Sequence, residues 1–106
     1  MDTTAAEVQI GRLGRLHVTV DGEQRPITGP VRRALLAVLA LHPGQVLSVE
    51  RLSDLIWDGD APATAGNALR VHVSQLRKML GRPDLIEWAG TGYRLAVAPQ
   101  DVDIAG

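Results

Sequence analysis

Between Asn67 and Lys78 the sequence is rich in side chains that can hydrogen-bond to nucleic-acid bases and phosphates. At about 100° per residue of an α-helix, most of these polar side chains fall on one face. Arginine can donate two hydrogen bonds to guanine, glutamine or asparagine can pair with adenine, and valine can touch a thymine methyl. The candidate base-contacting residues on this face are Asn67, Arg70, Val71, Ser74, Gln75, Arg77 and Lys78.

The opposite face of the same segment is apolar. Its members follow the i, i+4, i+7, i+11 spacing of one buried stripe, at Leu69, Val73, Leu76 and Leu80. The spacing predicts a helix from about Thr64, which can act as its N-cap, to Leu80. An ordinary solvated helix on a small α+β domain would show the same pattern, so the surrounding sequence has to decide between the two interpretations.

Basic charge is local in this chain. The 106 residues carry a net charge of −1, which by itself gives no support for binding nucleic acid. From Ala61 to Pro83, however, there are four basic residues and no acidic ones. Asp54, Asp58 and Asp60 lie just upstream and lack the ligand pattern of a calcium loop, so we expect them to cap a turn and expect no metal site.

Several classes of protein are disfavoured by composition. Without cysteine there can be no disulfide, thiolate metal site or cysteine nucleophile, which is compatible with a reducing cytoplasm. The acidic, polar start is unlike a signal peptide, and no apolar run approaches the length of a membrane span. We find no glycine-rich phosphate loop and no histidine pair at metal-binding spacing, so we expect no cofactor, and an enzyme is the least favoured class. The expected location is the cytoplasm.

The elements that would position the polar face can be read along the chain. Alternating side chains predict strands over Val8–Arg12 and Leu16–Val20, with a short return strand over Gln24–Ile27. Gly29 and Pro30 then open a helix that runs to Leu41 and stops before Pro43-Gly44. An N-terminal antiparallel sheet followed by a helix is therefore expected.

A second helix is predicted from the N-cap Ser48 to about Trp57, followed by a polar break over Asp58–Pro62. Two further runs, Leu85–Trp88 and Tyr93–Val97, flank a turn with two glycines and predict a hairpin. A helix, a break and a second helix with a polar outer face form a helix-turn-helix, whose second helix fits the major groove of about 12 Å width. The expected fold is thus α+β, a winged helix-turn-helix with an N-terminal antiparallel sheet, three helices and a C-terminal β-hairpin wing. We expect a flexible N-terminus over 1–7, one domain over 8–97, and a linker or cut end over 98–106.

A family resemblance rests on four ordered runs: Arg33-Ala-Leu-Leu-Ala-Val-Leu, Ser53-Asp-Leu-Ile-Trp57, Asn67-Ala-Leu-Arg-Val-His-Val-Ser-Gln-Leu-Arg-Lys78 and Gly90-Thr-Gly-Tyr-Arg94. Together they resemble the OmpR/PhoB-type winged-helix DNA-binding domain and, within it, the Streptomyces antibiotic regulatory protein (SARP) family of transcriptional activators. The resemblance spans about Val8 to Val97. It implies binding to direct repeats in promoters of secondary-metabolite gene clusters, with RNA polymerase as a partner and possible head-to-tail self-association on the DNA.

Site residues follow from the resemblance by position. It assigns the major-groove face to the helix predicted from about Thr64 to Leu80. It assigns a wing to Thr91, Gly92, Tyr93 and Arg94. Phosphate contacts are expected from Trp57 and His72, and also from Arg33 and Thr64, which lie at helix starts where backbone N–H groups suit an anion.

Two positions depart from the pattern of the wider OmpR type. Its wings often carry arginine just before the Gly-Thr-Gly-Tyr element, where this chain has Ala89, so deep minor-groove reading by the wing is not expected. Ser74 and Gln75 occupy recognition positions that are commonly basic in response regulators, which predicts a different base preference. A helical activation domain follows the winged helix in SARP proteins, whereas this sequence stops before one.

A winged helix can also serve for protein contact. In that case Arg70 and Arg77 would face acidic side chains of RNA polymerase or a partner subunit rather than phosphate. Salt dependence separates the two interpretations, because phosphate contacts release counterions and weaken steeply as salt rises.

Overall fold

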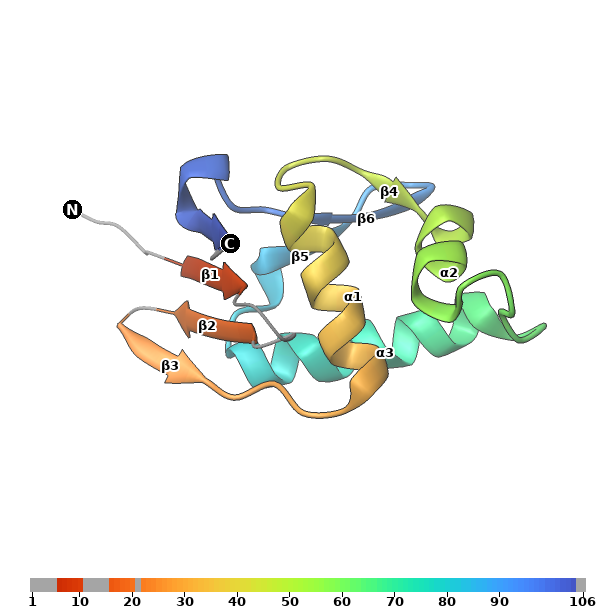
Figure 1. Cartoon of the computed structure of the whole chain (residues 1–106), viewed down its shortest axis with the longest axis horizontal. Coiled ribbons are helices and arrows are strands. Elements are labelled where there is room, and N and C mark those ends of the chain that lie inside the picture. Colours follow the sequence, from red (N-terminus) through yellow and green to blue (C-terminus); the bar gives the residue numbers. More distant parts are fainter. Residues whose placement is uncertain (1–5, 11–15, 21, 105–106) are drawn as a thin grey trace.

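The computed structural model describes residues 6–10, 16–20 and 22–104, and within them it contains three α-helices and two small sheets (Figure 1). In chain order the elements are β1 (Ala6–Ile10), β2 (Leu16–Val20), β3 (Glu23–Arg25), α1 (Pro30–Leu41), β4 (Leu47–Ser48), α2 (Val49–Trp57), α3 (Ala65–Leu80), β5 (Ile86–Trp88), β6 (Gly92–Leu95) and β7 (Val102–Ile104), with short 3-10 turns over Pro83–Leu85 and Pro99–Asp101. The predicted α+β winged-helix class is confirmed.

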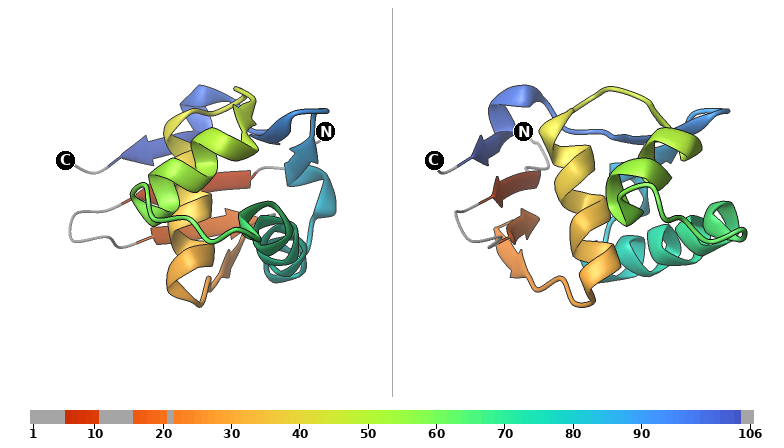
Figure 2. Two further views of the ribbon diagram at one scale, coloured as in Figure 1. Left: turned by 90° about the vertical axis from the view of Figure 1, so that its right-hand side faces the viewer. Right: turned by 45° about the vertical axis from the view of Figure 1, so that its right-hand side comes forward.

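Helix α1 lies in the middle of the molecule. The N-terminal sheet lies on one side of it, and α2, α3 and the β5–β6 hairpin lie on the other (Figures 1 and 2). Fully buried leucines from all three helices meet in the core between them, among them Leu35, Leu52 and Leu76.

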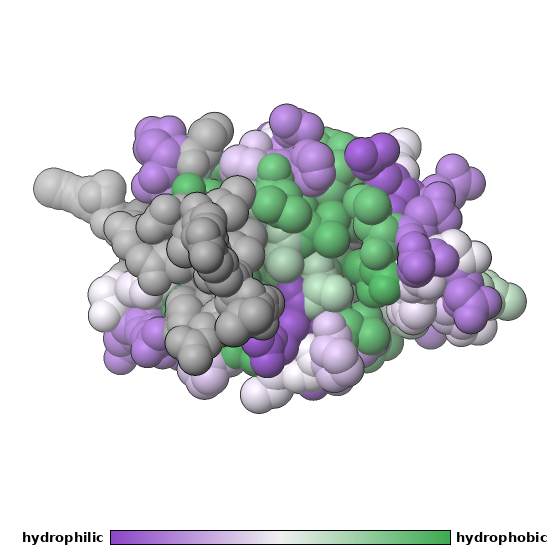
Figure 3. Space-filling view, in the orientation of Figure 1, coloured by the Kyte–Doolittle hydropathy of each residue, from purple (hydrophilic) through white to green (hydrophobic). Residues whose placement is uncertain are grey.

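Hydrophobic side chains also gather on the surface over α1 (Figure 3), which ends in the half-exposed Leu41. Among the described residues, no helix is both long and apolar enough to span a membrane.

Local sequence explains most helix ends. Ser48 caps α2 as expected, because its hydroxyl oxygen accepts a hydrogen bond from the backbone N–H of Arg51 at 3.1 Å. Helix α3 ends at Gly81, whose φ of 73° is strained for any residue with a side chain. The expected cap at the other end is wrong, since the Thr64 side chain makes no capping hydrogen bond. Only the carbonyl oxygen of Thr64 takes part, accepting from the N–H of Ala68.

The C-terminal segment is not a linker over its whole length, which corrects the expectation for 98–106. Residues Val102–Ile104 form β7, which pairs in parallel with β1 and gives the strand order β3-β2-β1-β7. The segment is too short to show periodicity in the sequence. Its strand conformation depends on the free edge of β1, which offers unpaired backbone N–H and C=O groups.

The first strand also begins earlier than expected. Ala6 and Glu7 pair with Val20 and Thr19, so these two residues are part of the sheet rather than of a flexible N-terminus over 1–7. Residues 1–5, and the end of the strand expected over 8–12, lie outside the described part of the chain. The return strand β3 is shorter than expected and ends before the buried Ile27.

Candidate nucleic-acid interface

The outer face of α3 carries most of the predicted base-contacting residues side by side. The six residues that line one shallow, open hollow along it are Asn67, Arg70, Val71, Ser74, Gln75 and Lys78. All six are exposed, and Val71 is 48% exposed despite its apolar side chain. Such a mixture of donors, acceptors and one apolar group matches what base edges present in a major groove.

The inner face of α3 fixes this surface in place. The four residues of the predicted apolar stripe are each no more than 1% exposed, at Leu69, Val73, Leu76 and Leu80. They pack into the core shared with α1 and α2. Because a buried stripe prevents the helix from rotating, the outer side chains point in a set direction.

Arg77 is the one residue of the predicted face that lies elsewhere. Its side chain is half-buried, and its Nε and Nη2 atoms donate to the carbonyl oxygen of Ile86 at 3.0 and 2.7 Å. The guanidinium therefore points to β5 and not toward the hollow on the outer face. No sequence signal marks this contact, because it depends on β5 lying beside α3.

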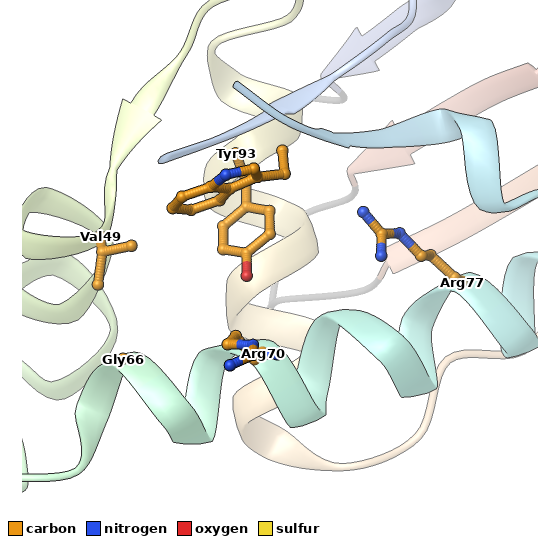
Figure 4. A pocket seen from close by; sticks show the side chains of 6 residues that line it. Val49, Gly66, Arg70, Arg77 and Tyr93 are labelled. Carbon is orange, nitrogen blue, oxygen red and sulfur yellow. The ribbon is translucent and has the colours of Figure 1, made fainter. Parts of the chain in front are cut away.

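A second hollow, of about 520 Å³, opens between α3 and the hairpin (Figure 4). It is lined by Val49, Gly66, Arg70, Arg77, Trp88 and Tyr93. The ring of Tyr93 points toward α3, and the Trp88 ring meets it edge-on at 5.0 Å between centroids. Trp88 is 53% exposed. Sequence reasoning did not select Trp88, although a tryptophan directly before the wing turn was an available signal.

The wing is the β5–β6 hairpin, as predicted, and β4 pairs with the other side of β6. Gly92 makes this three-stranded sheet possible, since a Cβ at that position would lie 1.9 Å from the carbonyl oxygen of Leu47. The exposed Thr91 accepts a hydrogen bond through its carbonyl oxygen from the N–H of Val49. These contacts attach the wing to the start of α2.

The positive charge of Arg94 on the wing is partly neutralised by a neighbouring carboxylate. It stands directly across the β5–β6 ladder from Glu87, and the two side chains form an ion pair. Both side chains are about two-fifths exposed. The carboxylate therefore offsets the guanidinium charge on this side of the wing.

The four predicted phosphate-contacting residues come from three helices and their boundaries. Arg33 is exposed in the first turn of α1, and Thr64 is exposed just before α3. Trp57, at the end of α2, is half-buried and packs against the core. His72 is half-buried with its Nδ1 atom enclosed and without a hydrogen-bond partner, which leaves Nε2 for any phosphate contact. Their contacts with DNA stay predictions.

Metal binding has no support from the described residues. No group of three or more histidine, cysteine, aspartate or glutamate side chains in that part of the chain lies close enough to hold an ion. The aspartates that precede α3 instead accompany a turn, in which Asp58 takes a left-handed conformation with φ of 53°. Asp58 thus lies at the turn as expected, whereas Asp54 lies within α2.

Comparison with known proteins gives a consistent set of relatives. A family model described as "Transcriptional regulatory protein, C terminal" matches residues 23–95. The transcriptional regulatory protein EmbR of Mycobacterium tuberculosis is 31% identical over 107 residues, covering 96% of this chain and 28% of EmbR. The regulatory protein AfsR of Streptomyces coelicolor is 34% identical over 99 residues, covering 92% of this chain and 10% of AfsR. The chain thus spans less than a third of the length of either curated relative.

Solved structures show the same fold. EmbR of M. tuberculosis in complex with a low-affinity phosphopeptide matches with a TM-score of 0.80 and 28% identity, over 94% of this chain and 27% of that one. The RstA DNA-binding domain of Klebsiella pneumoniae in complex with the RstA box matches with a TM-score of 0.61 and 26% identity, over 76% of this chain and 82% of that one.

Proposed function

Because the chain belongs to the family of transcriptional regulatory protein C-terminal domains, the OmpR/PhoB type of winged-helix DNA-binding domain, we propose that it binds double-stranded promoter DNA in a sequence-specific manner. This family is a class of DNA-binding domains of transcription regulators and not a class of enzymes. The observation that carries the proposal is the outer face of α3, where six exposed side chains suited to base edges lie together on a helix anchored by its buried stripe.

In this proposal α3 enters the major groove and reads base edges. Arg70 and Lys78 bring positive charge to the groove, and Asn67, Ser74 and Gln75 bring neutral donors and acceptors. The chain's overall charge of −1 is not an obstacle, since Arg70 and Lys78 lie on the outer face of α3 and residues 61–83 carry no acidic residue.

The hollow between α3 and the wing fits the sugar-phosphate backbone at the edge of that groove. Arg70 lines it from α3, and the half-exposed Trp88 lines it from the hairpin and carries an indole N–H that can donate to a phosphate oxygen. Ala89 at the wing turn and the Arg94–Glu87 pair both argue against strong minor-groove reading by the wing. The wing then serves mainly to orient α3.

The family also suggests which genes this domain regulates. We assign the domain to a transcriptional activator of a secondary-metabolite gene cluster that binds direct repeats in promoters and contacts RNA polymerase. Support comes from the SARP resemblance and from relatives such as AfsR, which is a regulatory protein of a Streptomyces species. Direct repeats would place two copies head to tail on one face of the DNA.

The test is selection of bound duplexes from a random DNA pool, followed by a salt titration on the selected sequence. Specific DNA binding predicts one enriched motif, with log K falling by about 0.9 per phosphate neutralised as log salt rises. Lys78 is expected to neutralise a phosphate at the edge of the groove, so Lys78→Ala should weaken binding to all sequences and flatten that slope by about one unit. If no duplex is retained at low salt, the proposal fails and protein contact becomes the better explanation of this surface.

A further inference from the structure

We propose that Arg32 of α1 sets the base preference of Gln75 by holding its amide oxygen away from the DNA. The inference rests on the proposed function, since it concerns which base α3 prefers once it lies in the major groove. Arg32 is a positioning residue in this view and need not touch a base itself.

The contact joins two elements far apart in the sequence. Nη1 of Arg32 donates to Oε1 of Gln75 at 2.6 Å. Nε of the same guanidinium donates to the carbonyl oxygen of Thr28 at 2.7 Å. Because the guanidinium is planar and its Nε is held by the Thr28 carbonyl, the backbone before α1 sets the direction from which the guanidinium meets Gln75.

Gly29 provides the space for this arrangement. Its φ is 88°, and a Cβ built there would lie 2.3 Å from Nη2 and 2.6 Å from Cζ of Arg32. Any side chain at position 29 would therefore displace the guanidinium from its place across the start of α1. The Gly29-Pro30 pair thus both begins the helix and lets Arg32 fold back toward α3.

The consequence for recognition follows from the two ends of the glutamine amide. Pairing with adenine uses both ends, since the oxygen accepts from N6 and the NH₂ group donates to N7. In this chain the oxygen accepts from Arg32, so the NH₂ group is the end of the exposed Gln75 amide that is left to meet a base. Guanine offers two acceptors on its major-groove edge, O6 and N7, and no donor. Gln75 is therefore assigned a preference for guanine over adenine.

The experiment compares base preferences of the wild-type protein and Arg32→Met, which keeps an unbranched side chain and removes the guanidinium donors. The Gln75→Ala variant is used first, to identify the base pair that Gln75 reads. That base pair is the one position of the DNA motif at which the variant no longer prefers any base. Wild type should favour guanine there. Arg32→Met frees the amide oxygen and should shift the adenine-to-guanine binding ratio by about fivefold or more toward adenine.

Two further variants make the result specific. Arg33→Met removes the same charge one residue along α1, so it should lower affinity for all sequences and leave the base ratio unchanged. Gly29→Ala keeps Arg32 but displaces its guanidinium, so it should shift the ratio in the same direction as Arg32→Met. Circular dichroism confirms that each variant is folded.

Three outcomes overturn the inference while the proposed function stands: a wild-type preference for adenine at this position, an unchanged ratio in both Arg32→Met and Gly29→Ala, or no position that responds to Gln75→Ala. Failure of the wild-type protein to select any DNA instead overturns the proposed function and this inference together.

Discussion

Two hydrogen bonds join the guanidinium of Arg77 to the carbonyl oxygen of Ile86, from Nε at 3.0 Å and from Nη2 at 2.7 Å. The donor belongs to α3 and the acceptor to β5, so the pair joins α3 to the wing hairpin. Bonds from a charged donor are stronger than those between neutral groups. Ile86 is fully buried, which makes this acceptor costly to leave unpaired.

Arg77→Ala should therefore lower stability rather than remove a base contact. We expect the free energy of unfolding to fall by about 1–2 kcal/mol, measured by urea denaturation, because the Ile86 carbonyl loses both donors. Arg70→Ala is the matched control, an exposed arginine on the same helix whose loss should change stability by under about 0.5 kcal/mol. Equal stabilities of Arg77→Ala and wild type would contradict this role.

Unlike Arg77→Ala, Arg70→Ala should leave the stability of the fold nearly unchanged and weaken DNA binding. We expect a loss of about 1–3 kcal/mol in specific binding, because Arg70 lines both hollows that the DNA would fill. Fluorescence anisotropy on the selected duplex measures it. Arg25→Ala removes the same charge from β3 in the N-terminal sheet and should bind nearly as wild type. Equal losses in the two variants would mean that α3 has no special part in binding.

Gly92→Ala should disrupt the wing sheet. A Cβ 1.9 Å from the Leu47 carbonyl oxygen requires β4 and β6 to separate, so we expect a loss of at least about 2 kcal/mol in the free energy of unfolding. Gly90→Asn is the control, because position 90 has a φ of 89° but open space around it, and asparagine tolerates such a φ better than most residues. Thermal unfolding followed by circular dichroism compares the two. A Gly92→Ala variant as stable as Gly90→Asn would show that β4 can move.

Asp84, just after α3, should give a small acid-sensitive contribution to stability. Its hydrogen bonds from the Arg82 side chain, at 3.1 and 2.5 Å, hold the pKa of this carboxyl below its ordinary value of 3.8. A carboxyl whose pKa is lower in the folded state stabilises the fold above the ordinary value, and that contribution is lost as pH falls through the lowered pKa. Asp84→Asn should therefore lose stability relative to wild type at pH 6 and approach it at the acid end of a denaturation series. A constant difference at all pH values would exclude this linkage.

The sequence alone determined the features that depend on neighbours along the chain. The apolar stripe ending at Leu80 specifies α3, because helical spacing places those side chains on one face. Ser48 and Gly81 mark helix ends through local hydrogen bonds and backbone conformation. These signals sufficed for the three helices, the hairpin and six of the seven residues on the outer face of α3.

Tertiary structure decided the contacts between segments far apart in the chain. Three contacts need a partner that only folding brings near. They are the hydrogen bonds from Arg77 to Ile86, the pairing of Arg32 with Gln75, and the addition of β7 to the edge of β1. A long polar side chain can satisfy its donors in several directions at similar free energy, so its final direction depends on which acceptor the packed elements place within reach. Helical periodicity could therefore place Arg77 on α3 but could not tell that its guanidinium is bound to the wing.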